Sequence, residues 1–133
     1  GLEKARALAE ARGVSLRTLH VDLSQYTIEP NAWDLIVSVF CHLPRDLRVR
    51  VHEGVAAGLR PGGKFVLEAY TPGQLSLNTG GPPSADVMMS LESLKRELAP
   101  LEFEHAAELQ REVYEGRYHH GTGAVVQIIA TRE

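Results

Sequence analysis

The segment Trp33-Asp34-Leu35-Ile36-Val37-Ser38-Val39-Phe40 is the most informative part of this 133-residue chain. It is almost continuously apolar and rich in β-branched residues. A strand covered on both faces, as in a parallel sheet, has this composition. Residues 45–59 place leucine or valine at every fourth position, which predicts a helix. Residues 64–70 form a second apolar run, so strand, helix and strand alternate as in an α/β sheet.

Two further elements are expected before this unit. Residues 1–12 carry apolar side chains at helical spacing, and Gly13 suits the end of that helix. Residues 14–23 alternate partly between apolar and polar side chains, which predicts a strand ending at Asp22-Leu23.

The segments after residue 70 have a different character. Residues 74–87 contain glycine and proline pairs without any period, which predicts a long loop that is functional or mobile. A short helix follows, with Leu91, Leu94 and Leu98 on one face. Residues 101–115 and 123–131 then predict an antiparallel hairpin, because only a turn fits between them.

Composition excludes several classes of protein. With a net charge of −3, the chain has no broad cationic field that would hold nucleic acid or an anionic membrane. No apolar run is long enough to cross a bilayer, and residues 1–12 do not resemble a signal peptide. The single cysteine, Cys41, excludes an internal disulfide and cannot by itself form a metal site. We therefore expect a cytoplasmic protein without a bound metal.

Two motifs give the chain a resemblance to a known family. The strand at residues 33–40, the helix after it and Gly58-Leu59-Arg60-Pro61-Gly62-Gly63-Lys64-Phe65-Val66-Leu67-Glu68 resemble the fourth strand, fourth helix and fifth strand of class I S-adenosylmethionine-dependent methyltransferases. The closing hairpin resembles the reversed seventh strand of that family. Within the family, "FCHLP", "NTGGP" and the hairpin motif "EGxxHxG" look most like bacterial methyltransferases of the tellurite-resistance type.

The resemblance implies a Rossmann-like α/β sheet, mostly parallel, with an antiparallel C-terminal hairpin and the strand order 3-2-1-4-5-7-6. Residues 1–133 would then be the C-terminal two-thirds of one methyltransferase domain, lacking its first two strands. The glycine-rich turn that lets backbone approach the cofactor is not found, since Gly62-Gly63 and Gly80-Gly81 follow the wrong strands. We expect the apolar edge along residues 35–39 to be covered either by the strand at residues 16–23 or by a second copy in a homodimer.

The resemblance further implies S-adenosylmethionine as cofactor and five residues that bind it. Asp22 matches the position whose carboxylate takes the adenine amino group, with the Leu23 backbone beside it. The alternative for Asp22 is capping of the next turn. Ser38, Val39 and Phe40 fall beneath the sulfonium and methionine part, although Val39 and Phe40 also suit a core.

Seven residues on the same rim are candidates for acting on the substrate. The candidate catalytic residues are His119, His42 and Tyr70, and the candidate substrate-binding residues are Asn78, Thr79, Gly80 and His120. A histidine with a near-neutral pKa can act as a base or orient an anion. The alternatives are helix capping for His42, an exposed turn for the histidine pair and a flexible surface loop for residues 78–82.

The predicted function is methyl transfer by the full-length parent from S-adenosylmethionine to a small molecule or a metalloid oxyanion. Such a reaction needs little acid or base catalysis, because the sulfonium is already a good leaving group and the enzyme mainly aligns the reactants. The rival hypothesis is a truncated, non-catalytic module that binds no cofactor and self-associates. A dehydrogenase fragment is weaker, since it does not explain the reversed terminal strand.

Overall fold

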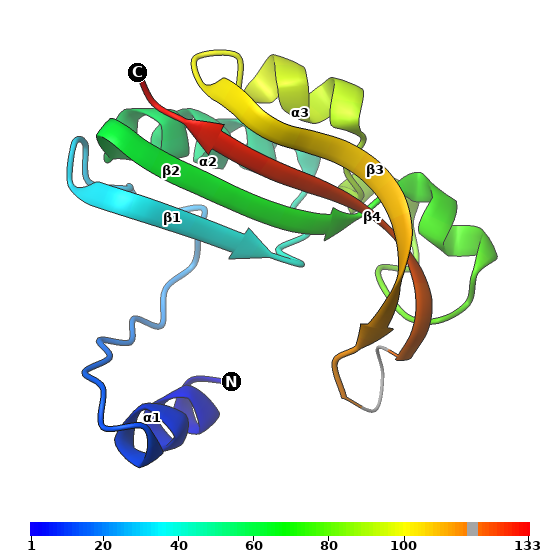
Figure 1. The fold of residues 1–133 in the computed structure, drawn as a ribbon, viewed down its shortest axis with the longest axis horizontal. Coiled ribbons are helices and arrows are strands. Elements are labelled where there is room, and N and C mark those ends of the chain that lie inside the picture. Colours follow the sequence, from blue (N-terminus) through cyan, green and yellow to red (C-terminus); the bar gives the residue numbers. More distant parts are fainter. Residues whose placement is uncertain (117–119) are drawn as a thin grey trace.

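A single four-stranded sheet forms the centre of the molecule (Figure 1). The structure, a computed structural model, describes residues 1–116 and 120–133. The strands are β1 (Trp33–Val39), β2 (Leu59–Tyr70), β3 (Glu102–Tyr114) and β4 (His120–Thr131). The helices are α1 (Leu2–Ala11), α2 (Arg45–Gly58) and α3 (Leu91–Glu97), with 3-10 turns η1 (Pro72–Ser76) and η2 (Ala85–Val87).

The sheet order is β1-β2-β4-β3, which corresponds to the last four strands of the order expected from the sequence. β1 and β2 pair in parallel because α2 carries the chain back across the sheet between them. β4 pairs antiparallel with both β2 and β3. The prediction of a mostly parallel sheet is therefore wrong for the described strands: the hairpin reverses β4, and β4 inserts between β2 and β3.

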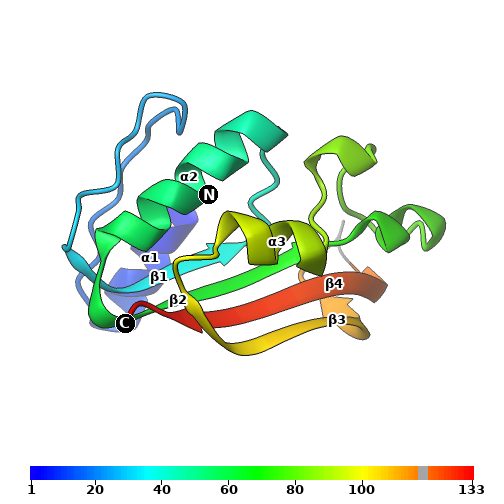
Figure 2. The ribbon, with the colours of Figure 1, turned by 90° about the horizontal axis from the view of Figure 1, so that it is seen from above.

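Helices α2 and α3, which pack on the sheet, lie on the same face of it (Figure 2). Every second residue of β2, beginning at Phe65, points into the core between the sheet and these helices. Val126 and Ile128 of β4 and Leu94 of α3 complete the centre of this core. The predicted helices at residues 45–59 and around Leu91 are confirmed, and their apolar faces are the ones that the core buries.

The opposite face and the free edge of β1 are open to solvent among the described residues. Leu35, Val37 and Val39 are 53%, 55% and 54% exposed. The expectation that this strand is covered on both faces is therefore wrong for the described part of the chain, since only its other side faces α2 and the core, through Ile36.

The predicted strand at residues 14–23 is also absent. These residues have no regular structure, and β1 pairs only with β2 among the described strands. Its apolar side chains remain exposed, including Leu16, Leu19 and Val21. Alternation alone does not make a strand, because backbone N–H and C=O groups still need a partner strand. The expectation that this segment moves in beside β1 is wrong.

Helix α1 lies at the end of this irregular segment and stands away from the sheet (Figure 1). It runs from Leu2 to Ala11, and Gly13 follows with a φ of 62°, as the sequence predicted. No helix in the described ranges is long and apolar enough to cross a membrane.

Candidate active site

Three aromatic rings come together where β1 and β2 end. Phe40 follows β1, Tyr70 is the last residue of β2, and their ring centroids lie 4.6 Å apart in a stacked arrangement. The His42 ring lies 5.7 Å from Tyr70 and nearly parallel to it. The carboxyl ends of parallel strands are where ligands bind in open α/β sheets. The structure thus brings together His42, Tyr70 and Phe40, three of the residues predicted from the sequence.

The local backbone explains how these rings meet. Phe40 adopts a left-handed conformation with a φ of 48°, and its N–H donates to Glu68 O at 2.8 Å. This bond extends the β1–β2 ladder by one residue while the chain turns away. His42 is thereby placed so that its Nε2 accepts the Tyr70 backbone N–H at 3.0 Å.

The bond to Tyr70 defines what His42 can do. A backbone N–H only donates, so Nε2 is the acceptor and the ring proton is assigned to Nδ1. His42 in this arrangement is a hydrogen-bond donor through Nδ1 and does not offer Nε2 as a base. The alternative of helix capping is not what the structure has, because α2 begins after Pro44 without any side-chain cap.

Tyr70 is almost completely buried, with 1% of its surface exposed. Burial raises the pKa of Tyr70, and the nearby Glu115 carboxylate raises it further, while Arg111 opposes this shift. The side chain is therefore a neutral phenol near pH 7, suited to hydrogen bonding and not to proton abstraction.

An ion pair lies beside the rings, on the open face of the sheet. Arg111 of β3 bonds both carboxylate oxygens of Glu68, and Gln127 of β4 donates to Glu68 Oε2 at 2.5 Å. Burial alone would raise the pKa of Glu68, but the bonds from Arg111 and Gln127 lower it overall. Sequence reasoning missed Arg111 and Gln127, because their proximity to Glu68 depends on the register of three strands.

The predicted substrate loop is tied to β4. Thr79 Oγ1 donates to Thr122 O at 2.6 Å, and Gln74 Nε2 donates to both Thr79 Oγ1 and Gly80 O at 2.9 Å. The alternative of a flexible surface loop does not fit these contacts. Asn78 is exposed with a φ of 55° and marks the outer bend of the loop. Gln74 was not identified from the sequence, since a glutamine in a glycine-rich loop carries no distinctive signal.

The hairpin reaches the same rim, as predicted. Tyr70 pairs with Val125, so the first residues of β4 extend beyond the end of β2. His120 lies there as an exposed residue whose ring meets Tyr114 edge-on at 4.8 Å. His119, a predicted catalytic residue, lies outside the described residues.

Three of the five predicted cofactor residues line one groove along the edge of β1. Leu23, Ser38 and Val39 contribute to this space of about 500 Å³, together with Tyr26 and Cys41. No glycine among the described residues lines it. The groove is mostly apolar, and Ser38 is one of the polar residues that line it.

Asp22 lies at the start of a turn and not at the end of a strand. No strand precedes it, and its Oδ1 accepts the Ser24 N–H at 2.8 Å, which is the turn-capping alternative. This backbone bond is the main cause of its lowered pKa. Asp22 is exposed, and its contact with the adenine amino group stays a prediction.

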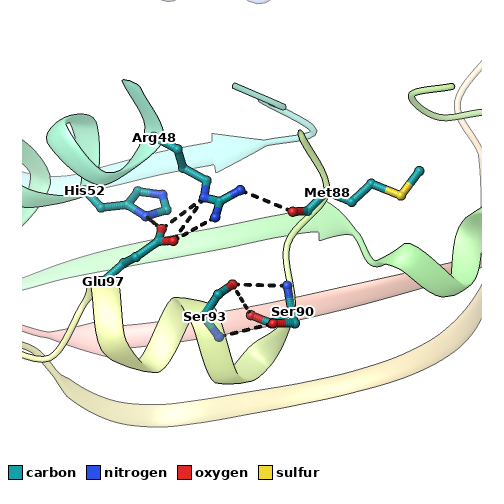
Figure 3. Close-up of polar contacts among 6 residues, drawn as sticks. All are labelled: Arg48, His52, Met88, Ser90, Ser93 and Glu97. Carbon is teal, nitrogen blue, oxygen red and sulfur yellow. Dashed lines mark hydrogen bonds and ion pairs between the residues drawn. The ribbon is translucent and has the colours of Figure 1, made fainter. Parts of the chain in front are cut away.

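A second polar cluster lies between α2 and α3 and holds the end of the loop that leads into α3 (Figure 3). Arg48 of α2 bonds Glu97 of α3 through Nη2 at 2.7 Å and Nε at 3.0 Å, and His52 Nδ1 lies 2.7 Å from Glu97 Oε2. Arg48 Nη1 also donates to Met88 O at 3.2 Å. The next residue, Met89, donates its N–H to Tyr70 O at 3.1 Å, which connects the cluster to the rim.

Comparison with known proteins supports the fold. No protein-family model and no curated protein matches the sequence. Among solved structures, TehB from Haemophilus influenzae matches with a TM-score of 0.72 and 18% identity, over 96% of this chain and 45% of TehB. An S-adenosylmethionine-dependent methyltransferase from Methanosarcina mazei matches with a TM-score of 0.67 and 16% identity, over 96% of this chain and 75% of that one.

The [4+2]-cyclase SpnF matches with a TM-score of 0.66 and 17% identity, over 96% of this chain and 60% of SpnF. This chain thus spans less than half of TehB and less than two thirds of SpnF. At these identities the similarity is one of fold. The chain has the α/β fold of S-adenosylmethionine-dependent methyltransferases, represented by the strands from β1 to the closing hairpin.

Proposed function

We propose that this chain forms the acceptor side of an S-adenosylmethionine-dependent methyltransferase site, with Phe40, His42 and Tyr70 next to the reacting methyl group. The observation that carries this proposal is the convergence of the three rings at the carboxyl ends of β1 and β2, in a fold shared with methyltransferases. Aromatic faces attract cations, so these rings suit the neighbourhood of a sulfonium.

The groove beside β1 would hold the cofactor, with Ser38 and Val39 beneath its sulfonium and methionine part and Leu23 on the side of its adenine. When bound, S-adenosylmethionine supplies a methyl group already activated for transfer. The chain's own task is then to hold the acceptor in line. The three rings would form the wall against which the acceptor packs, and Tyr70, as a neutral phenol, would not remove a proton from it.

The acceptor is a small molecule in this proposal. The resemblance to tellurite-resistance methyltransferases and the fold shared with TehB make a metalloid oxyanion one candidate. Burial is the main cause of the raised pKa of Tyr70; the carboxylates of Glu115 and Glu68 raise it further, and the Arg111 guanidinium that pairs with both opposes them, so the charge near the rim is mixed.

Calorimetric titration tests the proposal. S-adenosylmethionine and its demethylated product are titrated into this chain and into a version extended upstream by roughly one βαβ unit. Binding by the extended chain supports the proposal, and binding by neither chain contradicts it. Replacing Asp22 with Ala in the extended chain asks whether this residue takes the adenine: a weakened affinity would restore it to the site, and an unchanged one removes it.

A second candidate function is supported by a separate observation. β1 presents a free edge and three exposed aliphatic side chains, Leu35, Val37 and Val39. Exposed edges of this kind pair with other strands. The second candidate is therefore a module that self-associates through β1 and binds no cofactor. SpnF, a [4+2]-cyclase, illustrates that a protein with this fold can be described by a reaction other than methyl transfer. The titration above separates the two candidates.

A further inference from the structure

Buried polar side chains hold the loop between β2 and α3 at both of its ends. Arg48 holds the end next to α3, and Gln74 holds the end next to β2. Gln74 is 1% exposed, although it is a glutamine in a connecting segment. Its Oε1 accepts the Ala124 N–H at 2.8 Å, and its Nε2 donates to Thr79 Oγ1 and Gly80 O. Both amide protons and the carbonyl oxygen are used, so the side chain has one favoured orientation.

Beyond the end of β2, the Gln74 side chain takes the place of a backbone partner for β4. β2 ends at Tyr70, which pairs with Val125, so Ala124 lies one residue beyond the ladder. Thr71 N–H donates to Ala124 O at 3.0 Å, and Gln74 satisfies Ala124 N–H. The loop therefore continues the sheet through a side chain, and its position relative to β4 depends on that side chain.

Close contacts place Gly81 against Tyr70 and Thr79 against the start of β4. A Cβ on Gly81 would lie 2.9 Å from Tyr70 Cδ2, and a Cβ on Gly121 would lie 2.9 Å from Thr79 Cγ2. Only glycine permits these approaches at the positive φ values found at both positions. Thr79, Gly80 and Gly81 thus form a wall that is packed on Tyr70 and on the start of β4.

We propose that Gln74 is a positioning residue, which fixes Thr79 and Gly80 as a preformed wall of the acceptor pocket beside Tyr70. This inference rests on the proposed function for its role in methyl transfer, but the arrangement of the wall is independent of it. Gln74 acts through Thr79 and Gly80 and does not itself reach the acceptor, because it lies buried between the loop and β4. A change at Gln74 is expected to alter acceptor binding and to leave cofactor binding as it is.

Two substitutions separate the acceptor and donor roles of the amide. Gln74→Glu keeps an oxygen for Ala124 N–H but loses both donors to the wall. Gln74→Met is similar in size and loses both functions. Gln110→Glu is the matched control: it adds the same charge on β3 opposite Ala124, at an exposed position. Circular dichroism melting first verifies that each variant folds.

NMR measurements on the backbone amides give a readout that needs no ligand. In Gln74→Glu at pH 7.5 we expect the backbone order parameters of residues 79–81 to fall to about 0.6 or below, while the Ala124 N–H, which keeps its acceptor, stays protected from hydrogen exchange. In Gln74→Met the order parameters should fall likewise and exchange at Ala124 should accelerate ten-fold or more, and Gln110→Glu should match the wild type. Near pH 4, the introduced carboxyl gains a proton and one donor, so order at the wall should partly return in Gln74→Glu alone. Accelerated exchange at Ala124 in Gln74→Glu, or unchanged order at the wall in Gln74→Met, would overturn the proposal.

Methyl transfer to tellurite and to 2-mercaptoethanol supplies the functional readout. With either probe that the wild type methylates, Gln74→Glu should raise KM for the probe at least five-fold, with kcat and S-adenosylmethionine affinity within two-fold. A parallel loss of cofactor affinity would contradict a positioning role. If neither the wild type nor its extended version binds S-adenosylmethionine, the proposed function fails, and the NMR pattern alone decides whether Gln74 holds the wall.

Discussion

Glu97 is the carboxylate of a buried charged cluster, and its charge balances that of Arg48. It lies with Arg48 and His52 between α2 and α3, and all three side chains are at most 8% exposed. Replacing Glu97 with Gln keeps the shape but leaves the Arg48 guanidinium without a counter-charge. Removing one partner of a buried pair typically costs about 3–5 kcal/mol, so we expect a loss of unfolding free energy of that order in urea titrations.

Glu92 provides the control for this substitution on the same helix. It pairs with Arg96 at i,i+4, and both side chains are largely exposed. Glu92→Gln should change the unfolding free energy by less than about 0.5 kcal/mol. Equal losses in the two variants would show that the buried cluster does not stabilise the α2–α3 contact beyond an ordinary surface pair.

Glu97 also predicts how stability depends on pH. Burial alone would raise its pKa, but the bonds from His52 and Arg48 outweigh this and lower it from 4.5 to about 2. A lowered folded-state pKa contributes stability above pH 4.5, and this contribution is lost as pH falls from 4.5 to about 2. The full effect is on the order of 3 kcal/mol. Urea midpoints measured across this window should fall less steeply for Glu97→Gln than for the wild type.

Gly81 and Gly116 test whether the wall is packed on Tyr70. Both have positive φ, 95° and 92°, so alanine is strained at either position by about 1 kcal/mol. At Gly81 the new Cβ meets a buried ring, whereas at Gly116 none of the described residues lies within 4 Å of it. Gly81→Ala should therefore lower the urea midpoint clearly more than Gly116→Ala, and equal effects would mean that the wall moves aside freely.

At this scale the sequence predicted residue types better than their contacts. His42 and Tyr70 were expected at one rim and do meet there, because the ends of neighbouring parallel strands are adjacent whatever the side chains. The bond between His42 Nε2 and Tyr70 N–H could not be foreseen, since it depends on the left-handed turn at Phe40. Asp22 caps a turn, which was the alternative named for it, as short polar side chains do without help from tertiary structure, and its contact with the adenine stays a prediction.

Among the elements, those with a partner in the described chain were predicted well. β1, α2 and β2 follow directly from the spacing of apolar residues and from turn residues, and the hairpin follows from the short connection between residues 101–115 and 123–131. The segment at residues 14–23 has a similar alternation but no neighbouring strand, and it is irregular. The spacing of apolar residues shows which face of an element is apolar, whereas a strand also requires a neighbouring strand for its backbone hydrogen bonds.

Helices α1 and α3 should differ sharply in their contribution to stability. Leu94 of α3 is 0% exposed in the main core, and Leu8 of α1 is 57% exposed on a helix that stands away from the sheet. Leu94→Ala should cost about 2–5 kcal/mol by creating a cavity. Leu8→Ala should cost less than about 0.5 kcal/mol. A large effect of Leu8→Ala in chemical unfolding would show that α1 packs on another surface in solution.

For the whole molecule, strand order was predictable from resemblance, and the covering of the sheet was not. The described sheet has the order expected for the second half of a methyltransferase sheet, and it leaves β1 as a free edge. β1 carries only one charged residue, Asp34. Antiparallel pairing of two copies centred on Val37 would place Leu35 of each copy opposite Val39 of the other, so no like charges would meet. A two-fold axis makes such a contact self-complementary.

Sedimentation equilibrium tests this proposal of self-association through β1. The wild type should show a monomer–dimer equilibrium, because pairing satisfies the free backbone groups of β1 and brings its exposed aliphatic side chains together. Val37→Lys places a charge at the centre of the edge and should weaken dimerisation at least ten-fold. Val14→Lys makes the same change at a 60% exposed valine away from the sheet and should leave the equilibrium unaltered. A wild type that stays monomeric at millimolar concentration, or equal weakening by both substitutions, would rule out β1 as the contact.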